Sequence, residues 1–362
     1  MRIVRIANFV TPSSGGLRTA LRSLGAGYLA GGHEPVLIIP GPRDSSEHTP
    51  QGLVITLRGP RVPLLGGYRV LLVRRRVRAV LAALGPDVLE VSDRTTLRWT
   101  GRWARSRGIP SVMVSHESVR ALLPSWCGFA ADWLNRRTSA RYDRVVCTTG
   151  WAAAEFARIG APNVVQVPLG VNLTTFTPRP RRTPPCAEPG ADEVLLVHCG
   201  RLSPEKKPDR SLRTLASVRA RGIPARLVVA GDGPLRGALE RHAARAGLPV
   251  TFTGFISDTG ALAALLGSAD VALAPGPAET FGLAAVEALA CGTPVVVSAS
   301  SALPSLVGDA GVAVAGEDLA SGVLDLLRRP AAARRAAARA QAELFGWPAS
   351  VQGFLDVYRS LT

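Results

Sequence analysis

Residues 277–297 read PAETFGLAAVEALACGTPVVV, and this stretch decides the fold class. Leu283, Val286 and Leu289 recur at helical spacing, and a Gly-Thr-Pro turn ends the predicted helix. The apolar run 295–297 then predicts a short buried strand. A helix followed at once by such a strand is the repeating unit of a parallel α/β sheet.

Strands and helices alternate in the same way throughout the chain. Before residue 173, apolar runs predict strands at 2–9, 35–39, 88–91, 111–115, 144–148 and 164–167. After residue 192 they predict strands at 194–199, 225–230, 250–253, 271–274 and 295–298. Residues 174–192 are rich in proline and arginine, which is typical of a linker. We therefore expect two βαβ domains with parallel sheets at 1–172 and 193–343, a linker at 173–192, and an amphipathic helix at 344–362.

Composition excludes several classes of protein. With 362 residues, 47% of them hydrophobic, the chain can bury two cores, and it has no run of ~18 apolar residues that would predict a membrane span. Its five cysteines form no CxxC pair, which argues against a zinc ribbon and favours a reducing cytoplasm. The net charge of +16 is concentrated in residues 1–174, where 23 arginines face 10 acidic residues. This half is expected to attract an anionic partner.

Residues 277–297 also contain the most specific candidate site. Glu279 is expected in the loop before the predicted helix, and Glu287 within it. A helix start leaves backbone N–H groups free, here those of Phe281, Gly282 and Leu283, and such groups bind phosphate. A carboxylate in the loop can accept hydrogen bonds from sugar hydroxyls, and one in the helix can hold a ribose diol. Two glutamates on a solvated helix face are the alternative interpretation.

A second candidate site follows the predicted strand at 194–199. The run beginning at Gly200 places Arg201 and Lys206 in a polar loop, and Lys206 and Lys207 are the only lysines in a chain with 41 arginines. A guanidinium binds two phosphate oxygens at once, whereas a compact ammonium can follow one oxygen as charge develops on it. This combination suits a diphosphate leaving group, and a basic pair in a solvated surface loop is the alternative.

Two weaker signals lie in the first half, each at the end of a predicted strand. Gly15 and Gly16 follow the first strand and can present amides to a phosphate or a sugar, without the spacing of a dinucleotide site or a P-loop. His116 follows the strand at 111–115, at the sheet edge where open α/β folds bind ligands. The chain has no DxD or HExxH motif, so we expect no essential metal and no cofactor.

These motifs, in this order, resemble glycosyltransferase family 4, whose members are retaining nucleotide-sugar transferases of the GT-B fold. The resemblance covers nearly the whole chain and rests on the first Gly-Gly turn, His116, GRLSPEK from Gly200, GDGPL from Gly231, and the pair Glu279 and Glu287. It implies two Rossmann-like domains facing across a cleft, the first binding acceptor and the second nucleotide sugar, with the C-terminal helix crossing back to the first. Longer runs such as ANFVTPSSGGLRTAL and VPLGVNLTTF resemble actinobacterial GDP-mannose-dependent α-mannosyltransferases of glycolipid synthesis.

The resemblance implies a role for each matched position. Arg201 and Lys206 would bind the diphosphate and stabilise its departure, whereas Glu279 and His116 would contact the transferred sugar. Glu287 would hold the nucleotide ribose. The other donor-binding positions would act largely through their backbones: Gly15, Gly16, Gly200, Gly254, Phe255, Ile256, Phe281, Gly282 and Leu283. The family often has glycine at position 207, where this chain has lysine, and that difference leaves the path of the loop open.

The acceptor is expected to be a lipid-linked sugar or polyol. Residues 68–84 predict one amphipathic helix, and a basic helix of this kind can lie on an anionic membrane surface. Its basic residues are Arg69, Arg74, Arg75, Arg76 and Arg78. Packing of its apolar stripe against the sheet is the alternative. We expect a hexosyltransferase that takes mannose from GDP-mannose and is cytoplasmic, peripheral on the inner face of the cell membrane.

Three other functions stay open from the sequence. The donor could be a UDP-sugar and the acceptor soluble, because no side chain can be named that reads the base. The same architecture also occurs in nucleotide-sugar epimerases. The positive charge could mark a nucleic-acid-binding protein, but the sequence shows no basic patch interleaved with aromatics and only 5% aromatic residues. We therefore expect no nucleic-acid partner.

Overall fold

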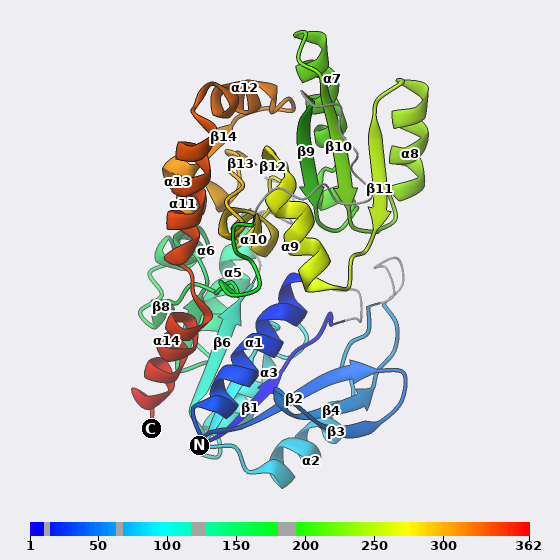
Figure 1. The fold of residues 1–362 in the computed structure, drawn as a ribbon. Coiled ribbons are helices and arrows are strands. Elements are labelled where there is room, and N and C mark those ends of the chain that lie inside the picture. The colour runs from blue at the N-terminus through cyan, green and yellow to red at the C-terminus, as the bar shows by residue number, and fades with distance from the viewer. Residues whose placement is uncertain (11–14, 63–67, 117–127, 180–192) are drawn as a thin grey trace. The chain divides into compact units, whose positions relative to one another are not determined.

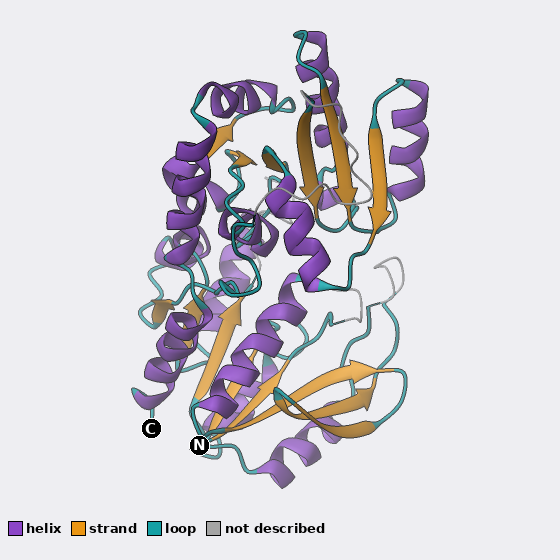
Figure 2. Ribbon diagram, in the orientation of Figure 1, coloured by secondary structure: helices purple, strands orange, loops and turns teal. Residues whose placement is uncertain are grey.

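The computed structural model describes residues 1–10, 15–62, 68–116, 128–179 and 193–362. The chain divides into two compact units, one formed by Met1–Gly170 with Trp347–Thr362 and the other by Val171–Gly346. Each unit is built on a sheet of mainly parallel strands with flanking helices, as Figure 1 and Figure 2 show. The predicted α/β class with two parallel sheets is confirmed.

The first unit contains an eight-stranded sheet in the order β3-β4-β2-β1-β5-β6-β7-β8. The strands are β1 (Arg2–Ile6), β2 (Glu34–Gly41), β3 (Ser45–Thr49), β4 (Gly52–Arg58), β5 (Val88–Val91), β6 (Ser111–Ser115), β7 (Arg144–Cys147) and β8 (Val164–Gln166). β3 pairs antiparallel with β4, and the other described pairs are parallel. The central strands are mostly apolar and buried because both of their faces are covered, and Arg5 of β1 and Glu90 of β5 are buried charged exceptions.

Helices of the first unit contribute to two separate cores. They are α1 (Gly16–Ala30), α2 (Arg74–Leu84), α3 (Trp99–Arg105), α5 (Gly128–Ser139), α6 (Gly150–Ala157) and α14 (Trp347–Arg359). Val77 of α2, Trp103 of α3 and Phe156 of α6 belong to one large core with the sheet. Leu21 of α1 packs in a second core with Leu37 of β2. The sheet is therefore covered on both faces.

The second unit contains a six-stranded sheet in the order β11-β10-β9-β12-β13-β14, and each described pair is parallel. The strands are β9 (Val194–Cys199), β10 (Ala225–Ala230), β11 (Val250–Gly254), β12 (Val271–Ala274), β13 (Val295–Ser298) and β14 (Gly311–Val314). The α-helices are α7 (Asp209–Ala220), α8 (Arg236–Arg245), α9 (Thr259–Ser268), α10 (Leu283–Ala290), α11 (Leu303–Val307), α12 (Ala320–Arg328) and α13 (Ala331–Glu343). Two short 3₁₀ turns are η2 (Pro204–Lys206) and η3 (Gly308–Ala310). None of the helices within the described ranges is both long and apolar enough to cross a membrane.

The C-terminal helix α14 belongs to the first unit, although the second unit precedes it in the sequence. The hydroxyl of Tyr358 on α14 donates a hydrogen bond to the Glu90 carboxyl of β5 and lies 3.0 Å from the hydroxyl of Tyr28 on α1. The three side chains are at most 1% exposed. This buried polar contact and the contacts between α1 and α14 fix the end of the chain, and the predicted return of the helix is confirmed.

The structure differs from the predicted elements at three strands and at one helix start, and two of those strands, β4 (GLVITLR) and β14 (GVAV), were not predicted although they are largely apolar. The sequence did not predict β3, because its residues SSEHT are polar and exposed and show no apolar alternation. The helix predicted over 68–84 begins only at Arg74. The segment before it is held as irregular backbone by the Leu71 N–H, which donates to the side-chain oxygen of Asn8 at 2.9 Å.

Candidate functional site

The strand order of the second unit marks one sheet edge as a ligand site. β9 and β12 are neighbours, and the chain proceeds from them toward opposite edges of the sheet. Open α/β sheets bind ligands beyond the carboxyl ends of the two strands at such a switch point. The loop after β9 carries Arg201 and Lys206, and the loop after β12 carries Glu279. The fold therefore brings the two most specific sequence motifs to one place.

Lys206 and Glu279 contact each other directly. The Lys206 ammonium donates to Glu279 Oε2 at 2.6 Å, across 73 positions of sequence. The two side chains are 33% and 21% exposed, so solvent screens the pair in part and its contribution to stability is small. The contact nevertheless holds both groups in defined positions at the sheet edge. The sequence assigned them separate partners, a phosphate and a sugar, and did not predict that they pair with each other.

One glycine shapes the loop that carries Glu279. Gly282 has a φ of +66°, in the left-handed region that favours glycine, and caps the N-terminus of α10. A Cβ at this position would lie 2.4 Å from Leu303 Cδ2 and 3.1 Å from Glu279 Cγ. The Glu279 carbonyl also accepts a hydrogen bond from the Ala302 N–H at 2.9 Å. The packing of the protein itself therefore requires glycine here, in addition to the predicted approach of a ligand.

The N-terminus of α10 begins at Leu283, slightly later than the sequence indicated. The Ala285 N–H donates to the Gly282 carbonyl at 2.8 Å, so the amides before it lie at the positive end of the helix dipole. The Phe281 ring is buried and meets Phe345 edge-on, with 6.1 Å between the ring centroids. Only the backbone of Phe281 is therefore presented to a ligand.

Glu287 is half-buried within α10. Burial raises the pKa of its carboxyl to about 7. Burial and then the charge of Glu287 raise the pKa of Cys199, at the end of β9, to about 12, which places the carboxylate near the first loop. Its side chain makes no hydrogen bond or ion pair with the residues that the structure describes. A carboxylate that burial makes costly to ionise gains most from hydroxyl donors such as a ribose diol.

The loops after β9, β10 and β11 close against one another. A Cβ at Gly231 would lie 1.9 Å from the Gly200 carbonyl oxygen, so the two backbones approach too closely for a side chain. The Gly231 N–H donates to the Gly254 carbonyl at 2.8 Å. After Gly254, Phe255 is 50% exposed and Ile256 is half-buried. The predicted base-binding loop and the predicted diphosphate loop therefore lie along one sheet edge.

Lys207 takes the backbone conformation that glycine would have at this position. Its φ of +47° and ψ of +49° are left-handed, and it ends the short turn η2 that carries Lys206. A side chain in this region costs about 1 kcal/mol, which a glycine avoids. Lys207 therefore adopts, at this small cost, the left-handed conformation that a glycine at this position would favour.

In the first unit, His116 lies at the carboxyl end of β6, as predicted. Its Nε2 is 3.2 Å from Ser92 Oγ, which follows the adjacent strand β5. Burial, and then the charges of Arg94 and Arg5, lower the pKa of His116 to about 4. The imidazole is therefore neutral at physiological pH and can exchange a hydrogen bond with a sugar hydroxyl without adding charge.

Gly15 and Gly16 mark the start of α1. Gly15 is exposed and caps the helix, and a Cβ on it would meet no described atom within 4 Å. Packing within the described protein therefore does not demand glycine at position 15. The other half of the predicted turn, Ser13 and Ser14, lies outside the described residues.

Comparison with known proteins assigns the chain. Residues 15–170 match the family described as "Glycosyl transferase 4-like domain", and residues 187–343 match "Glycosyl transferases group 1". A GDP-mannose-dependent alpha-(1-6)-phosphatidylinositol dimannoside mannosyltransferase of Mycobacterium tuberculosis is 53% identical over 369 residues, which cover 98% of this chain and 95% of that protein. The chain belongs to this glycosyltransferase family. The transferase is also 36% identical to a D-inositol 3-phosphate glycosyltransferase of Saccharomonospora viridis, over 61% of this chain and 56% of that one.

Solved structures show the same fold over nearly the whole length of the transferase. Sucrose-phosphate synthase from Thermosynechococcus elongatus superimposes with a TM-score of 0.81 at 25% identity, covering 99% of this chain and 98% of that one. An alpha,alpha-trehalose-phosphate synthase (UDP-forming) from Burkholderia vietnamiensis superimposes with a TM-score of 0.74 at 17% identity, covering 99% and 97%. The predicted family, the predicted GT-B fold and the prediction of a transferase enzyme are confirmed.

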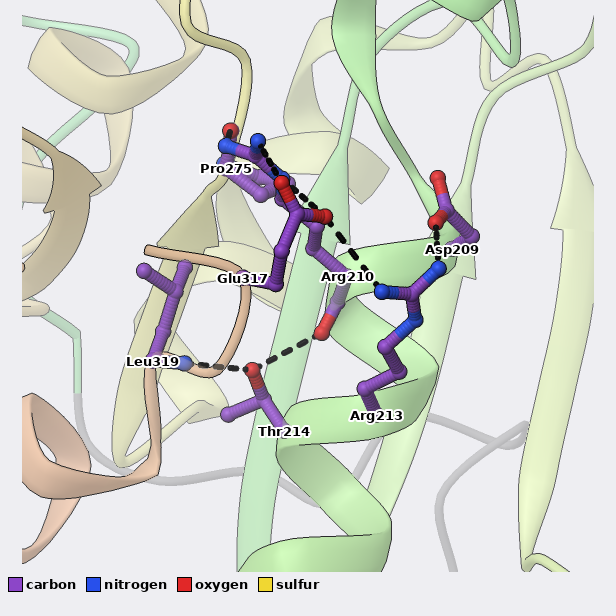
Figure 3. A network of polar contacts seen from close by, with 7 residues as sticks. All are labelled: Asp209, Arg210, Arg213, Thr214, Pro275, Glu317 and Leu319. Atoms are coloured by element: carbon purple, nitrogen blue, oxygen red, sulfur yellow. Dashed lines mark hydrogen bonds and ion pairs between the residues drawn. The ribbon is translucent and has the colours of Figure 1, made fainter. Parts of the chain in front are cut away.

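A buried arginine that the sequence did not single out holds the Glu279 loop of the transferase in place. The Arg210 guanidinium, from the first turn of α7, donates to the Pro275 carbonyl at 3.1 Å, where β12 passes into that loop. Two further N–H groups of Arg210 bind both carboxylate oxygens of Glu317, as Figure 3 shows. Arg213 contributes to the same carboxylate at 3.3 Å. The network joins α7, the loop after β12 and the segment after β14.

Two more buried polar groups were missed because their partners are distant in sequence. His198 of β9 accepts or donates at Nδ1 to Ser211 Oγ at 2.9 Å, and burial followed by the Lys206 charge lowers its pKa to about 4. In the first unit, Asn8 after β1 donates to the Asp93 carboxylate after β5 at 2.9 Å. Each pair lies at the carboxyl end of its sheet, and no residue spacing in the sequence indicates it.

The predicted membrane helix is only partly as expected. The apolar stripe of α2 packs into the protein, because Val77 and Leu81 belong to the core of the first unit. Arg76 forms an ion pair with Asp44, and the Arg69 guanidinium donates to a backbone carbonyl at 2.6 Å. The three remaining predicted arginines are exposed: Arg74, Arg75 and Arg78. This helix therefore presents charge, while its apolar face serves the fold.

Proposed function

We propose that this transferase moves mannose from GDP-mannose to a phosphatidylinositol-linked mannoside, with retention of the anomeric configuration. The observation that carries the proposal is the juxtaposition of Lys206, Glu279 and the N-terminus of α10 at the switch point of the second unit. The 53% identity to an enzyme named for this donor and this acceptor supports it over almost the full chain.

In this proposal each charged residue binds a different part of the donor. Arg201 and Lys206 bind the diphosphate, and Glu287 binds the ribose diol. Glu279 accepts hydrogen bonds from the sugar, which releases Lys206 from their mutual ion pair toward the phosphate. The predicted loop of Gly254, Phe255 and Ile256 holds the base. His116 and the amides near Gly16 contact the sugar and its phosphate.

The proposed reaction needs no protein nucleophile. The bond between the anomeric carbon and the diphosphate oxygen breaks, and the acceptor hydroxyl oxygen bonds to the same carbon from the same face. Its proton passes to the departing phosphate oxygen. The protein positions the reactants and stabilises the charge that develops on the leaving group. Because Arg201 and Lys206 supply that positive charge, we propose that no metal ion is required.

A lipid acceptor places the proposed reaction at a bilayer. We therefore propose that the enzyme is peripheral on the inner face of the cell membrane, with no nucleic-acid partner. The net charge of +13 in residues 1–174 supports contact with anionic headgroups.

The proposal is tested in two steps. First, thermal shift with GDP-mannose, UDP-glucose and UDP-N-acetylglucosamine ranks the donors, and GDP-mannose should stabilise the protein most. Second, transfer of labelled mannose is measured with phosphatidylinositol dimannoside, inositol phosphate or no acceptor, with and without EDTA. The expected result is EDTA-resistant transfer to the lipid. Stabilisation by UDP-sugars alone, or transfer only to inositol phosphate, would overturn the donor or the acceptor assignment.

A further inference from the structure

Two helices of the first unit bring five arginines together on its surface. Arg98 caps α3, Arg102 and Arg105 follow it at helical spacing within α3, and Arg137 lies in the last turn of the neighbouring helix α5. Arg141 follows two residues after α5. These five residues are called the arginine surface below. A surface hollow of about 340 Å³ is lined by Ala140 and four of the five arginines: Arg102, Arg105, Arg137 and Arg141.

The described residues provide the arginine surface with no compensating carboxylate. Among the described residues, none of the five arginines forms an ion pair with a carboxylate. Burial, and then the charges of Arg137 and Arg102, lower the pKa of Arg98, and burial followed by the charges of neighbouring arginines lowers the pKa of Arg141. The Nη1 atom of Arg98 is buried without a hydrogen-bond partner in the described structure. A cluster that repels itself in this way gains free energy from a bound anion.

Exposed aromatic rings stand beside the arginines. Phe129 and Trp133 are 75% and 51% exposed and precede Arg137 by eight and four residues on α5, so the three side chains share one helix face. The Arg137 guanidinium lies 4.1 Å from the Trp133 ring centroid, and that of Arg98 lies 5.9 Å from it. The sequence shows no basic patch interleaved with aromatics, because this one is assembled from two segments about thirty residues apart.

We propose that the arginine surface, with Phe129 and Trp133, is where the enzyme docks on an anionic phospholipid bilayer. The charges match the negative headgroups, and the exposed rings suit the boundary between headgroups and acyl chains. Two large rings exposed on one helix face are typical of an interaction site, and both gain free energy by entering that boundary.

The arginine surface is continuous with the predicted membrane helix. Arg78 of α2 lies 5.3 Å from the ring centroid of Trp99, the first residue of α3. The exposed arginines of α2 therefore extend the same basic region, although α2 offers it no free apolar face. The inference deepens the proposed function, because a lipid acceptor must be reached at a bilayer, but it can be tested without donor or acceptor.

The test compares variants that lose the same charge in different places. The full-length Arg102→Ser/Arg105→Ser/Arg137→Ser protein carries the loss on the arginine surface, and Arg221→Ser/Arg241→Ser/Arg245→Ser carries it on exposed positions of the second unit. Arg74→Ser/Arg75→Ser/Arg78→Ser tests α2. Co-sedimentation is measured with vesicles of equimolar phosphatidylcholine and phosphatidylglycerol, and with phosphatidylcholine alone. Thermal melting confirms that each variant is folded.

Each arginine near the bilayer is worth about fivefold in affinity, so the first variant should bind anionic vesicles on the order of 100-fold more weakly. The second-unit variant should bind like the unaltered protein, and the α2 variant should lose less than the first. Trp133→Ala should weaken binding by about tenfold without changing its salt dependence.

Three results would overturn the inference. The first variant could bind anionic vesicles as tightly as the unaltered protein, or the second-unit variant could lose as much affinity, which would make the effect one of net charge. Alternatively, the arginine surface could prove to bind duplex DNA more tightly than anionic vesicles. Mannose transfer to a detergent-dispersed acceptor should be unchanged in the first variant, so a failure of docking and a failure of the proposed transfer reaction remain distinguishable.

Discussion

Separating Lys206 from Glu279 should change donor binding and turnover in opposite directions. In the free protein the Lys206 ammonium is held by Glu279 at 2.6 Å. If Lys206 must leave that carboxylate to reach the diphosphate, then Glu279→Gln removes a competitor and raises the positive charge of the site. The same substitution weakens the hydrogen bonds that Glu279 offers to the sugar. Lys206→Met removes the phosphate contact itself.

The magnitudes follow from the geometry. A hydrogen bond between two charged groups contributes about 1.5–3 kcal/mol, and solvent screening reduces this because the two side chains are 33% and 21% exposed. Breaking the Lys206–Glu279 ion pair then costs about 1 kcal/mol when GDP binds. Glu279→Gln removes this cost and should therefore tighten GDP binding about fivefold. Loss of a group that stabilises developing charge costs about 10²–10³-fold in kcat. That loss is expected for Lys206→Met, which should also weaken GDP binding at least tenfold, whereas Glu279→Gln weakens charge-assisted hydrogen bonds to the sugar and should lower kcat by about 10–100-fold.

Isothermal titration with GDP and a steady-state transfer assay measure the two effects separately. The double variant Lys206→Met/Glu279→Gln completes a cycle that isolates the coupling between the residues. Thermal melting without ligand serves as the control for folding. The reasoning is refuted if Glu279→Gln weakens GDP binding as much as Lys206→Met does, because the carboxylate would then support the phosphate site instead of competing with it.

Three further predictions concern single residues. Because burial raises the pKa of Glu287 to about 7 from 4.5, its ionised fraction falls from about nine-tenths at pH 8 to one-tenth at pH 6. Titration should show GDP affinity falling by up to about tenfold over that range, and a similar slope in Glu287→Gln would contradict the assignment. The same shift makes the free protein lose stability as pH rises from about 4.5 to 7, which melting of the Gln variant should no longer show. Gly282→Ala should cost about 1–3 kcal/mol of stability and most of the turnover, because the left-handed φ and the 2.4 Å approach to Leu303 displace the Glu279 loop; an unchanged melting temperature and rate would refute this. Tyr358→Phe removes a buried hydrogen bond to Glu90 and should lower the free energy of unfolding by about 1.5–3 kcal/mol in denaturant titration, and an unaltered midpoint would show that the hydroxyl does not anchor α14.

Most strands and helices were predictable because each has a hydrophobic pattern within its own residues. Strands such as β9 and β13 are nearly continuous apolar runs bordered by Gly200 and by Pro294, respectively, and this signal needs no tertiary context. The polar strand β3 could not be found, because it forms by pairing with β4 along an exposed edge. The start of α2 was missed for a related reason: residues 68–73 are drawn out of the helix by a side-chain oxygen of Asn8, some sixty positions earlier.

The sequence also predicted which kinds of side chain the site contains, but it did not predict which of these side chains contact one another. A lysine kept in an arginine-rich chain and two glutamates around a helix start indicated phosphate and sugar chemistry. No spacing rule could show that Lys206 pairs with Glu279, or that Arg210 holds the Pro275 carbonyl, since the strand order of the sheet creates these contacts. The arginine surface was missed in the same way, because α3 and α5 each carry only half of it.

A structure of the enzyme with bound GDP-mannose would show directly which residues hold the donor. We predict that the diphosphate lies within hydrogen-bond distance of Arg201 and Lys206, that Glu287 holds the ribose, and that Lys206 has left Glu279, which contacts the mannose hydroxyls. A diphosphate bound elsewhere, with the Lys206–Glu279 ion pair intact, would contradict this prediction.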